Sequence, residues 1–160
     1  MELKRRTAPL RLVAMRLNMP ELEKVARQPG IVEAFRLTIQ YHDGRHPDQI
    51  ATLTRLQSGL SAHLEVHYRR ANDQTLVLAH TVEVDRFQGL LTALRKLDFD
   101  RLDDPADMPW HGADLWLVER GAGTFHHDFM LAPDSATGVH AEVVRLIREK
   151  LREAVRAINP

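Results

Sequence analysis

Two stretches of alternating apolar and polar residues, separated by only a few residues, constrain the fold of this chain more than any other feature. In both stretches, residues 62–69 and 74–84, the apolar side chains fall mainly on even-numbered positions. They are Leu64, Val66, Tyr68, Leu76, Leu78 and Val82. If paired strands bury one common face, even positions must lie opposite even positions, so the loop between them has an odd number of residues. The spacing therefore predicts a β-hairpin with a three-residue loop at Ala71–Asp73, in which Asn72 or Asp73 adopts a positive φ.

Two segments upstream of this hairpin are also predicted to be strands. Residues 31–41 alternate clearly, and one face carries Phe35, Leu37, Ile39 and Tyr41. Residues 49–57 are ambiguous, because Thr52 and Thr54 favour a strand whereas the apolar residues there occur at helical spacing. We expect a strand over 49–57 because the neighbouring segments are strands.

The first thirty residues are predicted to contain an arm, a short strand and a short helix. Residues 1–9 are polar and basic, so we expect a flexible arm. The alternation across residues 10–14 allows a short strand. Pro20 suits the first turn of a helix, and Pro29-Gly30 is a suitable end for that helix.

Two longer helices are predicted further along the chain. The middle helix covers about residues 86–97, with Asp85 as its N-cap and a stripe of leucines and Phe87 directed at the sheet. The C-terminal helix is long, over about residues 136–158, and also has a single apolar stripe.

The segment between these helices completes the predicted sheet. Residues 112–119 and 124–131 are expected to form a second hairpin, with Gly121 at the positive-φ position of its turn. Runs of strands joined by hairpins, rather than alternating strand–helix units, are typical of the α+β class. We therefore expect one α+β domain over residues 10–160, with an antiparallel sheet of about six strands.

The composition excludes several classes of function. The chain has no cysteine, which rules out an Fe–S cluster, a thiol nucleophile and a disulfide scaffold. Its 22 basic and 22 acidic residues give a formal net charge of zero, so we expect no nucleic-acid partner. Arg11 and Arg16 interrupt the only candidate signal peptide, and no apolar run reaches the roughly 18 residues of a membrane span. We expect a cytoplasmic protein with no membrane partner.

Nine histidines are the most unusual feature of the composition, and two clusters are candidate sites for a divalent metal such as Zn²⁺. His63, Glu65 and His67 alternate along a predicted strand, so their imidazole and carboxylate groups project from one face. His126 and Asp128 form a His-x-Asp pair, which is typical of iron sites with two histidines and one carboxylate. The competing interpretation of both clusters is the polar face of a half-buried strand.

A third group of histidines lies in a predicted loop. His42 and His46 flank Asp43-Gly44, whose residue types are already explained by a turn. The sequence therefore gives only weak support for metal ligation in this loop.

A binding patch is predicted where both tryptophans of the chain occur close together, at Trp110, His111, Asp114 and Trp116. Tryptophan is enriched among the residues that anchor protein interfaces. The competing interpretation is that these side chains cover the core where a loop enters the sheet.

The net charge of zero conceals two patches of opposite sign. Residues 1–30 contain seven basic and three acidic residues, whereas residues 98–119 contain seven acidic residues and one basic residue. These patches can pair within one chain or between two chains. We therefore expect a protein partner or a second copy of this chain, as in a homodimer.

The chain lacks the common motifs of catalysis and phosphate binding. There is no glycine-rich phosphate loop and no nucleophile-elbow motif. We therefore expect a small non-enzymatic interaction or binding module of the inhibitor or immunity type, without a cofactor. Two alternatives stay open, a metal-dependent enzyme that uses a His/Asp/Glu cluster and a small-ligand binder with a Trp-lined pocket.

Overall fold

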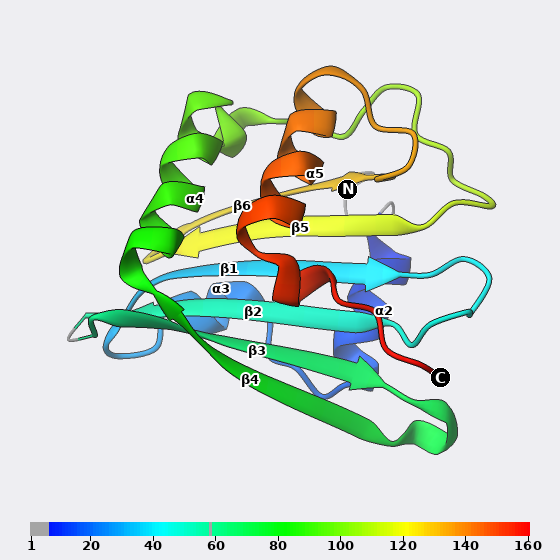
Figure 1. Ribbon diagram of the computed structural model, residues 1–160, viewed down its shortest axis with the longest axis horizontal. Helices are drawn as coiled ribbons and strands as arrows, with labels where there is room; N and C mark the ends of the chain where they lie inside the picture. Colours follow the sequence, from blue (N-terminus) through cyan, green and yellow to red (C-terminus); the bar gives the residue numbers. More distant parts are fainter. Residues whose placement is uncertain (1–6, 58) are drawn as a thin grey trace.

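A six-stranded antiparallel sheet forms the centre of the computed structural model, which describes residues 7–57 and 59–160 (Figure 1). The strand order is β4-β3-β2-β1-β5-β6. The strands are β1 (Ile31–Gln40), β2 (Gln49–Leu56), β3 (Ser61–Arg69), β4 (Thr75–Glu83), β5 (Leu115–Ala122) and β6 (Phe125–Leu131). The predicted α+β class and the antiparallel sheet of about six strands are confirmed.

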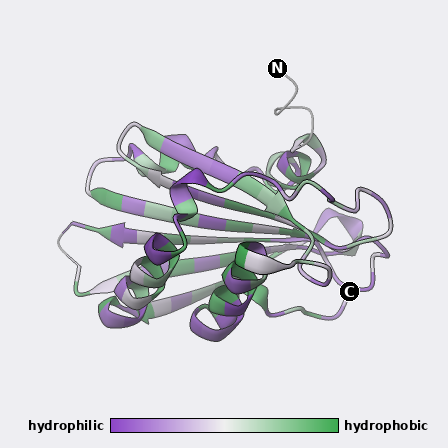
Figure 2. Ribbon diagram, turned by 90° about the horizontal axis from the view of Figure 1, so that it is seen from above, coloured by the Kyte–Doolittle hydropathy of each residue, from purple (hydrophilic) through white to green (hydrophobic). Residues whose placement is uncertain are grey.

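Helices cover both faces of this sheet (Figures 1 and 2). One face carries α4 (Val84–Lys96) and α5 (Gly138–Lys150), and the other face carries α2 (Ala8–Arg16) and α3 (Leu22–Ala26). Short 3-10 helices are η1 (Ala71–Asp73), η2 (Phe99–Arg101) and η3 (Arg152–Val155). Helices α2 and α3 contact β1, β5 and the strands beside them, so they cover the centre of the sheet on this face.

Strand β1 lies at this centre and is buried on both of its faces. Phe35 and Leu37 belong to the large apolar core beneath α4 and α5. Ala34 packs on the opposite face against the apolar residues of α3. Arg36 and Thr38 share that second face and are only 2% and 1% exposed, so a charged side chain is enclosed between the sheet and the N-terminal helices.

The hairpin predicted from the alternation is confirmed, together with its register. Ala62 lies opposite Val82, so even positions pair with even positions. The connection is η1, and both Asn72 and Asp73 have positive φ, at 65° and 58°. The parity of the apolar pattern therefore correctly predicts a loop with an odd number of residues.

The short strand predicted over residues 10–14 is wrong, because this segment is part of helix α2. Leu10, Val13 and Leu17 occur at helical spacing and are buried, and Pro9 occupies the first turn. Burial of this helical stripe on the sheet outweighs the two-residue alternation. The arm predicted for residues 1–9 lies mostly outside the described residues, and its last two residues begin α2.

The C-terminal helix is present, but α5 ends at Lys150 instead of continuing to about residue 158. The carbonyl oxygen of Lys150 accepts a hydrogen bond of 2.7 Å from Arg86 Nε of α4. The carbonyl oxygen of Ala154 accepts another of 2.7 Å from Gln49 Nε2 of β2. These tertiary hydrogen bonds hold the chain in η3 and an extended tail rather than in a further helical turn.

Two other element ends differ from the prediction. Helix α4 begins at Val84, so Asp85 lies in its first turn and is not the N-cap. Gly121 lies within β5, and the turn of the second hairpin is at Gly123, which has a φ of 57°. Gly121 is needed for close packing instead, because a Cβ atom there would lie 2.9 Å from Ala26 Cβ of α3.

Gly121→Ala is expected to lower the free energy of unfolding by about 1–3 kcal/mol, because the added methyl group pushes α3 away from the sheet. Chemical denaturation measures this change. Gly89→Ala in α4 is the matched control, because a Cβ atom there meets no atom within 4 Å, and we expect it to raise stability by about 0.5–1 kcal/mol. Equal effects of the two substitutions would contradict the close approach of α3.

Candidate functional site

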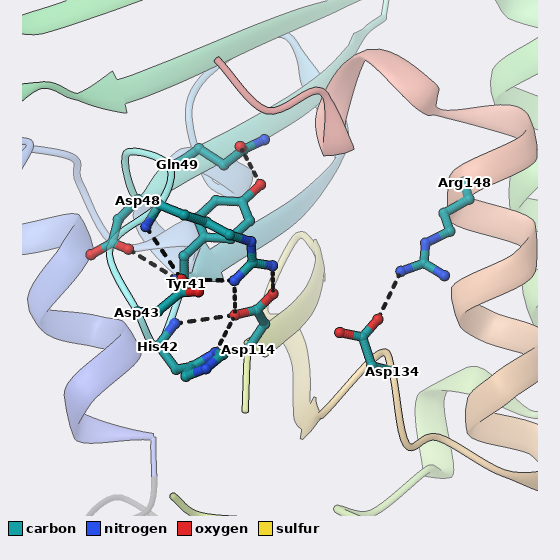
Figure 3. Close-up of polar contacts among 9 residues, drawn as sticks. Tyr41, His42, Asp43, Asp48, Gln49, Asp114, Asp134 and Arg148 are labelled. Atoms are coloured by element: carbon teal, nitrogen blue, oxygen red, sulfur yellow. Dashed lines mark hydrogen bonds and ion pairs between the residues drawn. The ribbon is translucent and has the colours of Figure 1, made fainter. Parts of the chain in front are cut away.

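Asp114, from the predicted binding patch, is the centre of a polar cluster at one end of the sheet (Figure 3). It precedes β5 and is 7% exposed. The backbone nitrogen and Nδ1 of His42 lie 3.1 and 2.9 Å from Asp114 Oδ1, and Arg45 pairs with both carboxylate oxygens. Arg45 also donates to Asp43 Oδ1 at 2.8 Å. Each charged group in the cluster therefore has an opposite charge beside it.

The electrostatics of this cluster indicate a structural role for Asp114. Burial favours the neutral acid, but hydrogen bonds from Arg45 and His42 outweigh that effect and lower the pKa of Asp114 to about 2. A carboxylate with such a pKa is a weak base and holds no proton to donate at neutral pH. We interpret the cluster as the contact that fixes the loop after β1 against the start of β5.

An open pocket of about 320 Å³ adjoins the cluster. Arg148 of α5 lies over Trp116 in this pocket, with its guanidinium carbon 5.6 Å from the ring centroid. Burial raises the pKa of Tyr41, which also lines the pocket, to about 12, and its hydroxyl donates to Gln49 at 3.2 Å. The pocket therefore combines the aromatic rings of Trp116 and Tyr41 with polar groups that already have protein partners.

The structure divides the predicted binding patch between two places. Asp114 and Trp116 line the pocket, and Trp116 is 3% exposed and part of the main core. Trp110 and His111 are exposed in the preceding loop and are not among the residues that line this pocket. A single binding patch built from all four residues stays a prediction.

His63, Glu65 and His67 lie on β3, on the side of the sheet that also carries α2 and α3. Glu65 is 3.1 Å from His63 Nε2 and 4.0 Å from His67 Nε2. Burial lowers the pKa of His67, whose Nδ1 has no hydrogen-bond partner in the described part of the chain. Metal binding by these three residues stays a prediction.

The second predicted metal cluster contains a third residue that the sequence did not indicate. Single donor atoms of His126, Asp128 and Glu119 lie within 4.8 Å of one another. The ring nitrogens of His126 lie 3.2 Å from Glu119 and 3.1 Å from Glu23 of α3, and the hydrogen bond with Glu119 raises the pKa of His126. Arg11 of α2 pairs with Asp128 and lies 3.8 Å from Glu119. A guanidinium therefore supplies the positive charge beside these carboxylates.

A cavity of about 190 Å³ lies next to this cluster, between α2 and the sheet. Its floor consists of two directly opposed residue pairs of β1 and β5, Arg36 with Glu119 and Thr38 with Leu117. Its walls and rim come from α2, the start of α3 and the residues between these helices. They consist of Leu10, Arg11, Ala14, Met15, Met19, Glu21 and Leu22.

Arg36 is the unusual residue of this cavity, because a buried arginine is normally paired with a carboxylate. Its Nε donates to Thr52 Oγ1 at 3.0 Å, and its Nη1 donates to the Pro20 carbonyl oxygen at 2.7 Å. Nη2 has no hydrogen-bond partner among the residues described, and the guanidinium forms no ion pair within 4.0 Å with any of them. Burial lowers the pKa of Arg36, although the charge of Glu119 acts in the opposite direction.

The side chains of Arg36 and Glu119 form no ion pair, because each contacts a partner on the side that faces away from the other. Arg36 is bonded to Thr52 on β2, whereas Glu119 contacts His126 on β6. The order β2-β1-β5-β6 places these two partners on opposite sides of the pair. The two charged ends therefore stay apart on the floor of the cavity.

Comparisons with known proteins add no function to this geometry. No known family model matches the chain, and no curated protein matches it. In residues 7–57 and 59–160, none of the helices has the length and apolar character needed to cross a lipid bilayer.

Asp114→Asn tests the structural role of the strand-end cluster. Because the folded pKa of about 2 is below the usual value, the carboxylate stabilises the fold above about pH 4, and this contribution is lost as the pH falls towards about 2. The variant is expected to lose about 1–3 kcal/mol of stability at neutral pH and to depend less on pH in the acid range. Denaturant unfolding across this range measures both effects.

The exposed Asp73 provides the control for this prediction, as Asp73→Asn. We expect the control to follow the wild-type curve. If Asp114→Asn also runs parallel to the wild type from neutral pH to the acid range, the carboxylate is not stabilising the loop.

Proposed function

We propose that this protein is a non-catalytic binding protein for a small molecule, and that the ligand occupies the cavity between α2 and the sheet. The observation that carries the proposal is the buried guanidinium of Arg36, which is one of the residues that line this cavity and whose Nη2 has no hydrogen-bond partner among the described residues. A buried charge without a close partner costs several kcal/mol, so a ligand that accepts hydrogen bonds from Arg36 offsets this cost. The volume of about 190 Å³ suits a ligand smaller than those in typical pockets of about 300–1,000 Å³.

The pairing of titratable groups around the cavity favours binding over catalysis. His126 has a carboxylate beside each ring nitrogen, from Glu119 and from Glu23. A histidine in that position holds its proton, whereas a general base needs a free lone pair near neutral pH. Arg11 is likewise engaged by Asp128. These groups are suited to shaping a site rather than to transferring protons.

A protein partner or a homodimer is a further part of this proposal, based on the opposite charges of residues 1–30 and 98–119. Part of the acidic segment is engaged within the chain. Asp100 pairs with Arg120 at 2.6 Å, and Asp104 accepts a hydrogen bond of 2.7 Å from the Met130 amide. We expect a partner to bind the other acidic residues of segment 98–119.

Filling the cavity from α2 tests the proposed function. Ala14 lines the cavity, whereas Leu12 of the same helix is 44% exposed and is not one of its lining residues. We screen the wild type by thermal shift against amino acids, organic acids, sugars and nucleobases, and then test the ligands found on Ala14→Phe and Leu12→Phe. We expect ligands that bind the wild type and Leu12→Phe but not Ala14→Phe.

Circular dichroism of Ala14→Phe is the control for folding, because it distinguishes a loss of binding from a loss of structure. Ligand binding that survives in folded Ala14→Phe would place the ligand elsewhere and contradict the proposal. A wild type that binds no compound of the screen would contradict it as well.

A second candidate function is a metal-dependent enzyme, and the cluster of Glu119, His126 and Asp128 favours it. Their donor atoms lie within 4.8 Å of one another and are of types that bind Zn²⁺ and other divalent metals. Glu119 also lines the cavity, so a metal in the cluster would be next to a ligand there. The metal would have to displace Arg11 from Asp128.

Titration with Zn²⁺ by calorimetry tests this second candidate in the wild type and in Arg11→Ala. Removal of the competing guanidinium is expected to strengthen metal binding, because two carboxylates then lack a cation. His126→Ala in the Arg11→Ala background is expected to abolish the gain. Absence of Zn²⁺ binding in Arg11→Ala would exclude the second candidate, with Zn²⁺ as the metal, and leave the first unchanged.

A further inference from the structure

The floor of the cavity beneath α2 presents one positive and one negative side chain next to each other. Arg36 and Glu119 are directly opposed on β1 and β5, where Cβ atoms lie about 4.5–5.5 Å apart. They are only 2% and 4% exposed. Their charged ends form no direct ion pair, because Thr52 holds the first and His126 contacts the second. The floor of the cavity therefore carries a positive and a negative group that are close together but not in direct contact.

Both side chains keep the capacity for further hydrogen bonds. A guanidinium has five N–H donors, and the hydrogen bonds of Arg36 to Thr52 and Pro20 use two of its nitrogens, Nε and Nη1. In Glu119, the contacts with His126 and Arg11 both involve Oε1. A ligand between the two side chains can therefore accept from Arg36 and donate to Glu119.

The charges around the cavity favour a ligand that carries both signs. Two basic side chains and two carboxylates line the cavity, namely Arg36 and Arg11 against Glu119 and Glu21. These four charges balance. A simple anion or cation would disturb the balance, whereas a zwitterion leaves it unchanged.

Most of the other residues that line the cavity are apolar and suit a hydrocarbon side chain. Leu10, Leu22 and Leu117 line it and are each 1% exposed. Met15 and Met19 stand nearer the surface, and methionine adapts to apolar groups of different shape. The polar groups of the ligand therefore belong on the floor, and its apolar part belongs towards α2.

We propose that the cavity binds an α-amino acid with an apolar side chain. Its carboxylate accepts hydrogen bonds from Arg36, its ammonium group donates to Glu119, and its side chain packs against Leu10, Leu22 and Leu117. An α-amino acid carries its two charged groups on one carbon atom, which matches two opposite charges close together on adjacent strands. This inference rests on the proposed small-molecule function and adds the chemical class of the ligand.

Calorimetric titration of the full chain with L-leucine tests the inference, together with two analogues that each lack one charged group. These analogues are 4-methylpentanoate, which lacks the ammonium group, and 3-methylbutylamine, which lacks the carboxylate. We expect L-leucine or L-methionine to bind and each analogue to bind at least about tenfold more weakly, as is typical for the loss of a charge-assisted hydrogen bond. An analogue that binds as tightly as the amino acid would overturn the inference.

Substitutions on the floor supply the second part of this experiment. Arg36→Met replaces the buried charge by an apolar chain, a change that is often tolerated in protein interiors, and Glu119→Gln keeps the shape of the side chain. Each variant is expected to weaken amino-acid binding at least about tenfold, whereas Leu12→Phe leaves it unchanged. If Arg36→Met does not fold, the binding measured for Glu119→Gln is the test of the inference. Unchanged amino-acid binding in either variant, once it is shown to be folded, would overturn the inference.

The small-molecule screen separates a failure of this inference from a failure of the proposed function. If both amino acids fail to bind but another compound binds the wild type and not Ala14→Phe, the ligand class is wrong and the binding function stands. If no compound binds the wild type at this cavity, both are wrong.

Discussion

The pairing of β1 with both β2 and β5 is the constraint on which the rest of the structure depends. It makes β1 a central strand that is covered on both faces, so its two sets of side chains face two different interiors. One interior is the apolar core beneath α4 and α5. The other contains Arg36, which is buried and donates hydrogen bonds to Thr52 and the Pro20 carbonyl oxygen. The pairing with β5 also brings Glu119 opposite Arg36, and so creates the polar floor of the cavity.

Local alternation was sufficient to predict the hairpin of β3 and β4, since a two-residue period determines both the buried face and the loop parity. It failed at α2, where Leu10 and Val13 fit a helix as well as a short strand. Contact with the sheet decides between the two, and that contact is not a local property. The end of α5 depended in the same way on hydrogen bonds from distant side chains such as Arg86.

The candidate site was predicted only in part, because its residues come from segments far apart in the chain. His126 and Asp128 were selected as a pair, but Glu119 joins them through the register of β5 and β6. Asp114 was assigned to a tryptophan-containing patch, and its partner His42 comes from the loop after β1 (Figure 3). Arg45, its second partner, comes from the same loop. In each case the sequence indicated a reactive residue type but not the opposite charge beside it. That charge decides whether the group acts as a ligand, a base or a structural contact.

A crystal structure of the wild type, at a resolution that shows ordered water, tests the separation of Arg36 and Glu119 most directly. We predict that Arg36 keeps its hydrogen bonds to Thr52 and the Pro20 carbonyl, and that water or a small molecule lies between the guanidinium and the Glu119 carboxylate. A direct ion pair between Arg36 and Glu119, with α2 packed down on it and no space left above the floor, would show that the two charges are not separated.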